Sequence, residues 1–116
     1  KKYRVVKTLR VKDDTVLSLI PKYRDVNALL LDTYSEEKLG GTAAAFDWQI
    51  AKEAKRFGLP IILSGGLNSE NIKSAMEQVN PYAADVCSGI EQSPGIKDHE
   101  LMAQFLASAW EEEWGL

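Results

Sequence analysis

The sequence predicts an α/β protein in which short strands and helices alternate around a parallel sheet. The first observation is a series of short apolar runs, each followed by a segment whose apolar residues recur at helical spacing. The second is a pair of turns of small residues: residues 60–68 have the sequence PIILSGGLN, and Cys87-Ser88-Gly89 ends the last run. A buried strand that ends in glycines and leads into a helix is typical of a phosphate site, because backbone N–H groups are exposed there.

The length and composition indicate one ordinary domain. At 116 residues the chain can bury a single core, and 45% hydrophobic with 27% charged residues is usual for a soluble globular protein. The net charge of -3 gives no attraction to nucleic acid or to an anionic membrane, and no apolar run approaches the ~18 residues of a spanning helix. The single cysteine, Cys87, excludes an internal disulfide and fits a reducing compartment. We therefore expect a cytoplasmic protein without nucleic-acid or membrane partners.

The first half of the chain contains two predicted strands. Residues 3–11 (YRVVKTLRV) are rich in β-branched side chains, which favours a strand. Asp13 can begin a helix whose apolar residues precede Pro21. Residues 28–32 (ALLLD) form a continuous apolar run of the kind that lies inside a parallel sheet, and this run ends on the carboxylate of Asp32.

The next unit contains a loop and a helix. Residues 33–45 are predicted to form a loop centred on Gly40 and Gly41. Asp47 can cap the helix that follows, since aspartate is a preferred N-cap residue. Gly58 occupies the position of a C-terminal helix stop.

The second half repeats the pattern. After the strand within PIILSGGLN, Asn68 or Ser69 can cap a helix. Residues 84–87 (ADVC) are the last predicted strand. Residues 91–97 are predicted to form a loop because they contain a Pro-Gly turn signal, and Asp98 then begins the C-terminal helix.

The position of the glycine turns favours a barrel over an open sheet. An open doubly wound domain carries its phosphate turn after the first strand, whereas the phosphate site of a (β/α)8 barrel uses the last two strand-to-helix loops. Counted from the C-terminus, Gly65-Gly66 and Ser88-Gly89 occupy those two loops. A complete barrel takes ~250 residues. We therefore expect residues 1–116 to form one unit, a parallel (β/α)4 half of a TIM (β/α)8 barrel, and specifically its second half.

Four strings along the chain resemble one known family. They are LLLDT, GGT-x-x-x-FDW, PIILSGGLN-x-EN and DVCSGIE-x-SPGIKD, in that order. Together they are similar to phosphoribosylanthranilate isomerase of tryptophan biosynthesis. The resemblance extends over most of this chain but over only the latter half of the family's barrel.

The resemblance implies an Amadori rearrangement. In this reaction the sugar ring of N-(5-phosphoribosyl)anthranilate opens and the aminoaldose becomes an aminoketose. The chemistry needs a general acid at the ring oxygen and a general base at C2. The family's acid is the aspartate that closes the LLLD strand, which corresponds to Asp32. No metal or organic cofactor is implied, because only proton transfers are required.

The resemblance also implies where the substrate lies. Its phosphate would lie on five residues of the two turns: Gly65, Gly66, Asn68, Ser88 and Gly89. The loop of Gly40, Gly41 and Thr42 would close over the anthranilate end. Residues 43–45 are alanines where family members often carry glycine and polar residues, which predicts a stiffer loop.

The family's general base is a cysteine on the first strand of the barrel, in a segment that this chain does not contain. Cys87 lies on the last predicted strand, and we expect it to be a small buried packing residue. We therefore expect these 116 residues to be inactive alone and to need an N-terminal half-barrel. Open sheet edges would otherwise favour pairing with a second copy. The whole enzyme is expected to be a monomer or a homodimer.

Two other interpretations stay open at this point. One is another phosphate-binding barrel enzyme of sugar or indole metabolism, such as a pentose-phosphate epimerase or indole-glycerol-phosphate synthase, although GGT-x-x-x-FDW argues against both. The other is a non-catalytic half-barrel that binds phosphate without turnover. At the level of single residues, Asp32 could simply cap the turn after its strand, and Gly65-Gly66 could be a turn without a ligand.

Overall fold

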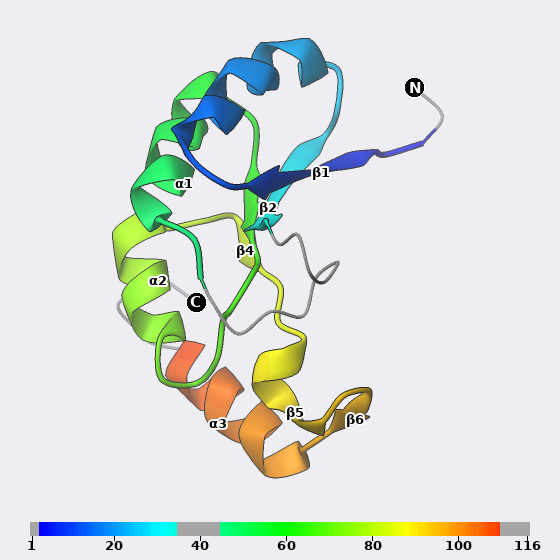
Figure 1. Ribbon diagram of the computed structural model, residues 1–116, viewed down its shortest axis with the longest axis vertical. Helices are drawn as coiled ribbons and strands as arrows, with labels where there is room; N and C mark the ends of the chain where they lie inside the picture. Colours follow the sequence, from blue (N-terminus) through cyan, green and yellow to red (C-terminus); the bar gives the residue numbers. More distant parts are fainter. Residues whose placement is uncertain (1–2, 35–44, 110–116) are drawn as a thin grey trace.

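The fold is built on a four-stranded parallel sheet whose strands lie side by side in chain order (Figure 1). The computed structural model describes residues 3–34 and 45–109. The strands of the sheet are β1 (Val6–Val11), β2 (Ala28–Thr33), β3 (Ile61–Leu63) and β4 (Ala83–Ala84). Leu9 is in register with Leu31, and Leu31 with Leu63, so these three residues form one row across the sheet. Parallel neighbours need a crossover connection, which the helical segments between the strands supply.

The helical segments lie mainly along one side of the sheet (Figure 1). They are the 3-10 helix η1 (Asp14–Tyr23), α1 (Trp48–Ala54) with the 3-10 turn η2 (Lys55–Phe57), α2 (Ile72–Val79), the 3-10 turn η3 (Ser88–Ile90) and α3 (His99–Ala109). Between η3 and α3 the chain forms a small antiparallel hairpin of β5 (Glu91–Ser93) and β6 (Ile96–Lys97). The described fold is therefore an α/β arrangement, as the sequence predicts.

The core lies between the sheet and the helices. Leu9 and Val11 of β1 and Leu29 and Leu31 of β2 are buried at alternate positions, as expected for a face packed against helices, and Ala28 at the start of β2 is buried as well. Leu29, Leu31 and Leu63 are fully buried, and they belong to one apolar cluster with residues of η1, α1 and α2. On the opposite face of β1, the side chains of Val6 and Arg10 are exposed. The sequence pattern therefore directs the helices to one face of the sheet.

Helix ends follow the predicted capping residues. Asp47 accepts a hydrogen bond from Gln49 N at 3.0 Å at the start of α1, and Gly58 ends η2 with a left-handed φ of +86°. Lys55 donates from Nζ to the carbonyls of Val79 and Asn80, each at 2.9 Å. These carbonyls lie at the C-terminus of α2, where a cation is favourable, so Lys55 ties α1 and α2 together.

Three predicted boundaries differ from the structure. β1 begins at Val6 rather than at Tyr3, because β2 begins at Ala28 and that residue pairs with Val6. The helix after β1 is a 3-10 helix that continues through Pro21 to Tyr23. The predicted loop over residues 91–97 forms the β5–β6 hairpin, with Gly95 at a φ of +82° in its turn.

The fourth strand is also shorter than predicted. The sequence predicts a strand over residues 84–87, but β4 is confined to Ala83 and Ala84. Its neighbour β3 ends at Leu63, and the chain then turns away through Gly65 and Gly66, both at positive φ. Asp85 N still donates to Leu63 O at 2.8 Å, whereas Val86 and Cys87 lie beyond the end of the pairing with β3. None of the helices within residues 3–34 and 45–109 combines the length and apolar character that a bilayer crossing requires.

Candidate active site at the carboxyl ends of the strands

Asp32 lies where the sequence predicts it, near the carboxyl end of β2. Its Oδ1 accepts a hydrogen bond from Thr33 N at 2.8 Å. Its Oδ2 lies 3.5 Å from Nη1 of Arg10, which is its register partner on β1. The two side chains differ in enclosure, since Asp32 is 16% exposed and Arg10 is 35% exposed. Asp32 is thus a partly buried carboxylate paired with a cation near the carboxyl end of its strand.

The first glycine of the turn after β3 lies directly against Asp32. Gly65 has a φ of +89°, and Gly66 follows at +68°, so both use the left-handed region that glycine adopts without strain. A Cβ on Gly65 would overlap Thr33 Oγ1 and would stand 2.6 Å from Thr33 N. The same Cβ would be 3.0 Å from Asp32 Oδ1. Glycine at position 65 therefore lets this turn approach the carboxylate.

Two asparagines organise the remainder of this turn. Asn68 Oδ1 accepts from the backbone N–H groups of Glu70 and Asn71, at 2.9 and 3.0 Å. In return, Asn71 Oδ1 accepts from Asn68 N at 2.8 Å, and Asn71 Nδ2 donates to Gly66 O at 2.8 Å. This reciprocal arrangement fixes the entry into α2. Because the Asn68 backbone N–H already donates to Asn71, the predicted contact between Asn68 and phosphate would have to use a different atom of Asn68.

The second predicted turn lies against the first. A Cβ on Gly89 would overlap Leu67 O and would stand 3.0 Å from Leu67 C and 3.1 Å from Asn68 Cα. Ser88 and Gly89 are the first two residues of η3. The turn of residues 65–68 therefore approaches Asp32 at Gly65 and Gly89 at Leu67, at the same ends of the strands. The loop residues Gly40, Gly41 and Thr42 lie outside the described residues.

Three polar residues of this region were not singled out from the sequence. Ser64 follows β3 and is buried, and its Oγ lies 3.1 Å from Oδ2 of the exposed Asp85, which follows β4. Arg10 is the third, through its pairing with Asp32. A signal for Asp85 was available, since this carboxylate follows its apolar run as Asp32 follows the ALLL run. The Arg10–Asp32 and Ser64–Asp85 pairings depend on the register between neighbouring strands, which cannot be read from a local sequence pattern.

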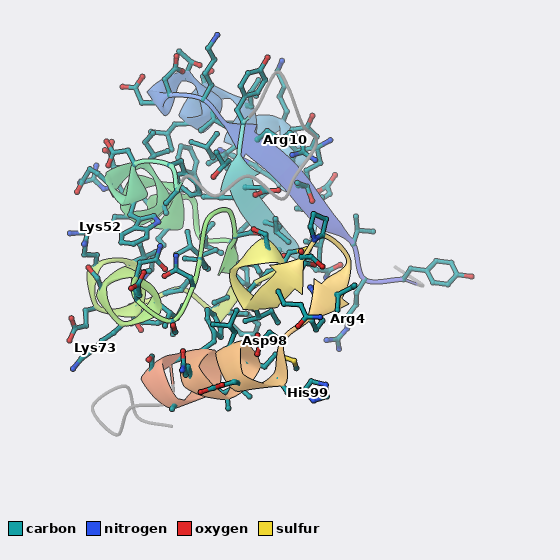
Figure 2. The ribbon with its side chains drawn as sticks, turned by 60° about the horizontal axis from the view of Figure 1, so that its bottom comes forward. Arg4, Arg10, Lys52, Lys73, Asp98 and His99 are labelled. Carbon is teal, nitrogen blue, oxygen red and sulfur yellow. The ribbon has the colours of Figure 1, made fainter. Side chains whose placement is uncertain are left out.

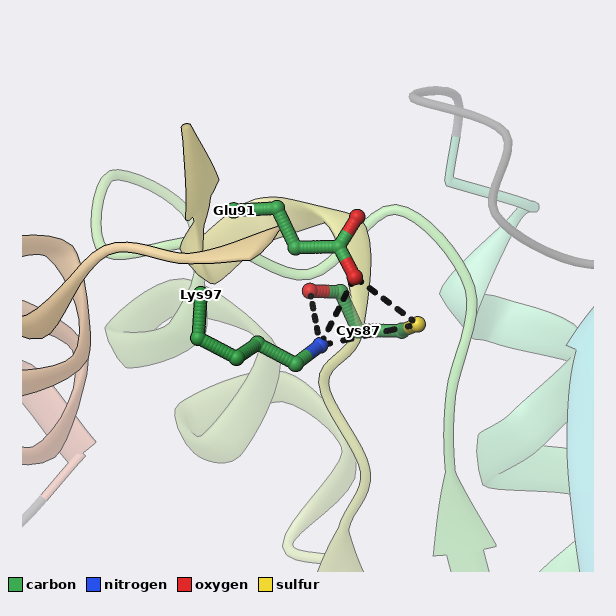
Figure 3. Close-up of polar contacts among 3 residues, drawn as sticks. All are labelled: Cys87, Glu91 and Lys97. Atoms are coloured by element: carbon green, nitrogen blue, oxygen red, sulfur yellow. Dashed lines mark hydrogen bonds and ion pairs between the residues drawn. The ribbon is translucent and has the colours of Figure 1, made fainter. Parts of the chain in front are cut away.

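Cys87 is not the buried packing residue that the sequence predicts; its side chain is exposed. Figure 3 shows it beside the hairpin, with Glu91 and Lys97. Its Sγ lies 3.7 Å from Glu91 Oε2 and 3.8 Å from Lys97 Nζ, and Lys97 also donates to Cys87 O at 3.1 Å. The expectation fails because β4 ends before Cys87, which leaves this residue outside the sheet.

The Lys97–Glu91 ion pair joins the two strands of the hairpin. Lys97 Nζ lies 2.8 Å from Glu91 Oε2. The hydrogen bond that Lys97 donates to Glu91 lowers the pKa of Glu91, and the same bond raises the pKa of Lys97. Asp98 follows the hairpin and accepts from the backbone N–H groups of Glu100 and Leu101, so it caps α3 as predicted.

Other charged side chains lie away from the candidate site. Figure 2 shows Lys52 and Lys73 projecting from α1 and α2 on the outer side, whereas Arg10 lies on β1. Within the described parts of the chain, no group of three or more His, Cys, Asp or Glu side chains is placed to hold a metal ion.

Comparison with known sequences identifies the family. A sequence model described as "N-(5'phosphoribosyl)anthranilate (PRA) isomerase" matches residues 1–108. A protein of Geobacter metallireducens named N-(5'-phosphoribosyl)anthranilate isomerase is 51% identical over 106 residues, which cover 91% of this chain and 52% of that protein. Its namesake in Trichlorobacter lovleyi is 45% identical over 108 residues, with 93% and 52% covered. The chain thus spans about half the length of the curated relatives it matches.

Solved structures give the same result. The crystal structure of phosphoribosyl anthranilate isomerase from Thermotoga maritima superposes with a TM-score of 0.81 at 36% identity, over 93% of this chain and 52% of that one. A phosphoribosyl anthranilate isomerase in complex with reduced 1-(o-carboxyphenylamino)-1-deoxyribulose 5-phosphate superposes with a TM-score of 0.76 at 34% identity, over 93% and 49%. With the family match over residues 1–108, these similarities show that the chain belongs to the N-(5'-phosphoribosyl)anthranilate isomerase family.

Proposed function

We propose that this chain is the second half of a (β/α)8 barrel and supplies the general acid and the phosphate turns of an N-(5'-phosphoribosyl)anthranilate isomerase. The observation that carries the proposal is that the turn of residues 65–68 approaches Asp32 at one end and Gly89 at the other, at the carboxyl ends of the strands. In barrels of this class, ligands and catalytic groups are found at that end. Family membership favours this reaction over that of the other phosphate-binding barrels.

The sheet supports the half-barrel part of the proposal. Its strands follow one another in chain order, and its helices cover one face. Among the described strands, β1 and β4 each have one neighbour in the sheet, so each can pair with a further strand. Four more strand and helix units would close such a sheet into a barrel. They would be about as long as the unmatched half of each relative's sequence.

The proposed reaction uses Asp32 as a proton donor. Asp32 protonates the ring oxygen of the substrate, and the bond between that oxygen and C1 breaks as the nitrogen lone pair forms a C=N bond. A base then removes the C2 proton, and the electrons of the C–H bond form C1=C2 and return the nitrogen to an amine. The resulting enol tautomerises to the ketone when C1 gains a proton and the C2 hydroxyl loses one. We assign the base to the N-terminal half of the barrel.

The phosphate would lie against the backbone of the two contacting turns. Gly65 and Gly66 leave no side chain between their backbone and a ligand, and Gly89 lets the second turn approach the first. Backbone N–H groups at such turns bind phosphate oxygens well. Ser88 adds a hydroxyl at the second turn. We keep Asn68 in the proposed phosphate site, with its side chain also holding the turn that leads into α2.

The test is a chimera in which this chain replaces the matching half of the Geobacter metallireducens relative. We expect the chimera to turn over N-(5'-phosphoribosyl)anthranilate, followed by the loss of substrate fluorescence, and this chain alone to be inactive. Turnover by the purified chain alone would overturn the assignment of the base to the N-terminal half. A folded chimera that binds phosphate but never turns over would favour a non-catalytic binding module.

The role of Asp32 is tested within the same chimera. Asp32→Asn removes the transferable proton with little change in shape, and general acid catalysis typically contributes ~10²–10⁴-fold. We expect kcat to fall by about that factor while the fold is retained. Asp14→Asn, at an exposed position in the first turn of η1, removes the same charge as a control and should leave kcat unchanged. An unchanged kcat in Asp32→Asn would remove Asp32 as the general acid.

A further inference from the structure

Arg10 and Asp32 meet because of the register of two parallel strands. Position 10 of β1 pairs with position 32 of β2, so both side chains leave the sheet at the same level. Arg10 Nη1 lies 3.5 Å from Asp32 Oδ2, while Asp32 Oδ1 accepts from Thr33 N at 2.8 Å. The two carboxylate oxygens are therefore restrained by different groups, one on each strand.

The surroundings of the carboxylate leave few ways for it to rotate. Gly65 and Thr33 close the Oδ1 side, since a Cβ on Gly65 would come within 3.0 Å of that oxygen. On the Oδ2 side, within the parts of the chain that the structure describes, Arg10 is the cationic side chain within ion-pair distance. Asp32 is 16% exposed and Arg10 is 35% exposed, so the pair is screened less than a surface pair.

Position matters for a proton donor. An aspartate free to change its χ1 rotamer spends only part of its time directed at the ring oxygen of a substrate. A displacement of about 1 Å can cost up to ~10²-fold in rate, because proton transfer requires close and aligned atoms. A single contact on the Oδ2 side can therefore influence turnover without touching the substrate.

We propose that Arg10 is a positioning residue for Asp32, which holds the Asp32 carboxylate in one rotamer at the carboxyl ends of the strands through its contact with Oδ2. This inference rests on the proposed role of Asp32 as the general acid. Arg10 does not transfer a proton itself. Its guanidinium restrains Oδ2 while the Thr33 N–H restrains Oδ1.

A competing role for Arg10 makes a different prediction. The guanidinium is partly exposed and carries five N–H donors, so it could donate to a negatively charged ligand as well as to Asp32. If Arg10 bound the ligand directly, its loss would weaken ligand binding and raise KM. If Arg10 positions Asp32, its loss lowers kcat and leaves KM nearly unchanged.

The kinetic experiment uses the active chimera with Arg10→Met and Arg10→Lys. We expect Arg10→Met to lower kcat about tenfold with KM changed less than twofold, and Arg10→Lys to recover part of the loss because it keeps a cation near Oδ2. Lys12→Met is the matched control: it removes one positive charge two residues away, where Lys12 lies 5.5 Å from the centre of the Tyr34 ring. Its kcat and KM should equal those of the parent, which is the chimera without substitutions.

A second measurement reports the position of Asp32 without activity. Three-bond scalar couplings of the Asp32 side chain give its χ1 distribution by NMR. We expect one dominant χ1 rotamer in the parent chimera and averaged couplings in Arg10→Met. If Arg10→Met does not fold, Arg10→Gln takes its place with the same expectations.

The outcomes separate this inference from the proposed function. A rise in KM with unchanged kcat, or unchanged kcat together with unchanged Asp32 couplings, overturns the positioning role. Loss of activity in Asp32→Asn with full activity in Arg10→Met retains the proposed function and rejects the inference. An inactive but folded parent chimera rejects the proposed function, and the couplings then still decide whether Arg10 fixes the Asp32 rotamer.

Discussion

Gly65 lies so close to the β2 strand end that an added Cβ would stand 3.0 Å from Asp32 Oδ1 and 2.6 Å from Thr33 N. The glycine has a φ of +89°, a conformation that other residues rarely adopt. Two separate requirements therefore favour glycine at this position, one set by the backbone and one by the neighbour. The contact joins the turn that we propose holds phosphate to the carboxylate that we propose as the general acid.

Gly65→Ala should be more destabilising than a comparable change elsewhere. Gly58→Ala is the matched control, because Gly58 has a φ of +86° but no atom within 4 Å of an added Cβ. We expect Gly58→Ala to cost about 1–2 kcal/mol of backbone strain. Gly65→Ala should cost about 1–3 kcal/mol more for the overlap with Thr33. Urea unfolding of the chimera measures both, and equal losses in the two variants would show that position 65 tolerates a Cβ.

Gly89→Ala tests the contact between the two turns. An added Cβ at this position would overlap Leu67 O, so the Ser88-Gly89 turn should move away from the 67–68 backbone. We expect the affinity of the chimera for inorganic phosphate to fall at least about tenfold, since backbone donors act only at hydrogen-bond distance. NMR titration with inorganic phosphate gives the affinity. Gly95→Ala is the control, because an added Cβ at this position of the hairpin turn meets no atom within 4 Å, and this variant should bind phosphate like the unsubstituted chimera. If Gly89→Ala also bound phosphate with the affinity of the unsubstituted chimera, the proposed site would be contradicted.

The hairpin ion pair predicts a defined dependence of stability on pH. Lys97 lowers the pKa of Glu91 below its usual 4.5, so the unfolded chain binds more protons at acid pH and stability falls as the pH drops through the folded pKa. Glu91 raises the pKa of Lys97 above 10.5, so its contribution is lost as the pH rises through that folded pKa. The pair should therefore contribute fully at neutral pH and lose its contribution at both extremes.

Glu91→Gln isolates the acid part of this dependence. Urea unfolding at a series of pH values from 3 to 7 should show a shallower acid decline in Glu91→Gln than in the parent. Adding Lys97→Met to Glu91→Gln should change the acid decline no further, because the two residues act as one pair. An identical pH dependence in parent and Glu91→Gln would show that the pair does not form in solution.

The sequence predicts the parts of the site that depend on local patterns. The apolar ALLL run places Asp32 near the end of β2, and Asp47, Gly58 and Asp98 end or begin helices as expected. These predictions hold because strand burial and helix capping are decided by residues close in the chain. Family strings then assign roles to positions that local physics leaves ambiguous.

The contacts between strands could not be predicted in the same way. Arg10 meets Asp32 because β1 and β2 pair in one particular register, and Ser64 meets Asp85 across β3 and β4. Cys87 was expected in a strand over residues 84–87, yet β4 ends at Ala84 and leaves Cys87 outside the sheet. In each case the deciding fact is where a neighbouring strand begins or ends.

The exposure of Cys87 gives a direct chemical test of that correction. Cys87 is the single cysteine of this chain, so a thiol reagent added to the purified chain modifies that residue alone. We expect complete modification by a maleimide in the absence of urea, because an exposed thiol needs no unfolding to react. Cys87→Ser should take up no reagent. A buried thiol would instead react only through opening of the fold, at a rate that increases across the urea transition. Protection of Cys87 until that transition would show that the strand extends to residue 87, as the sequence predicts.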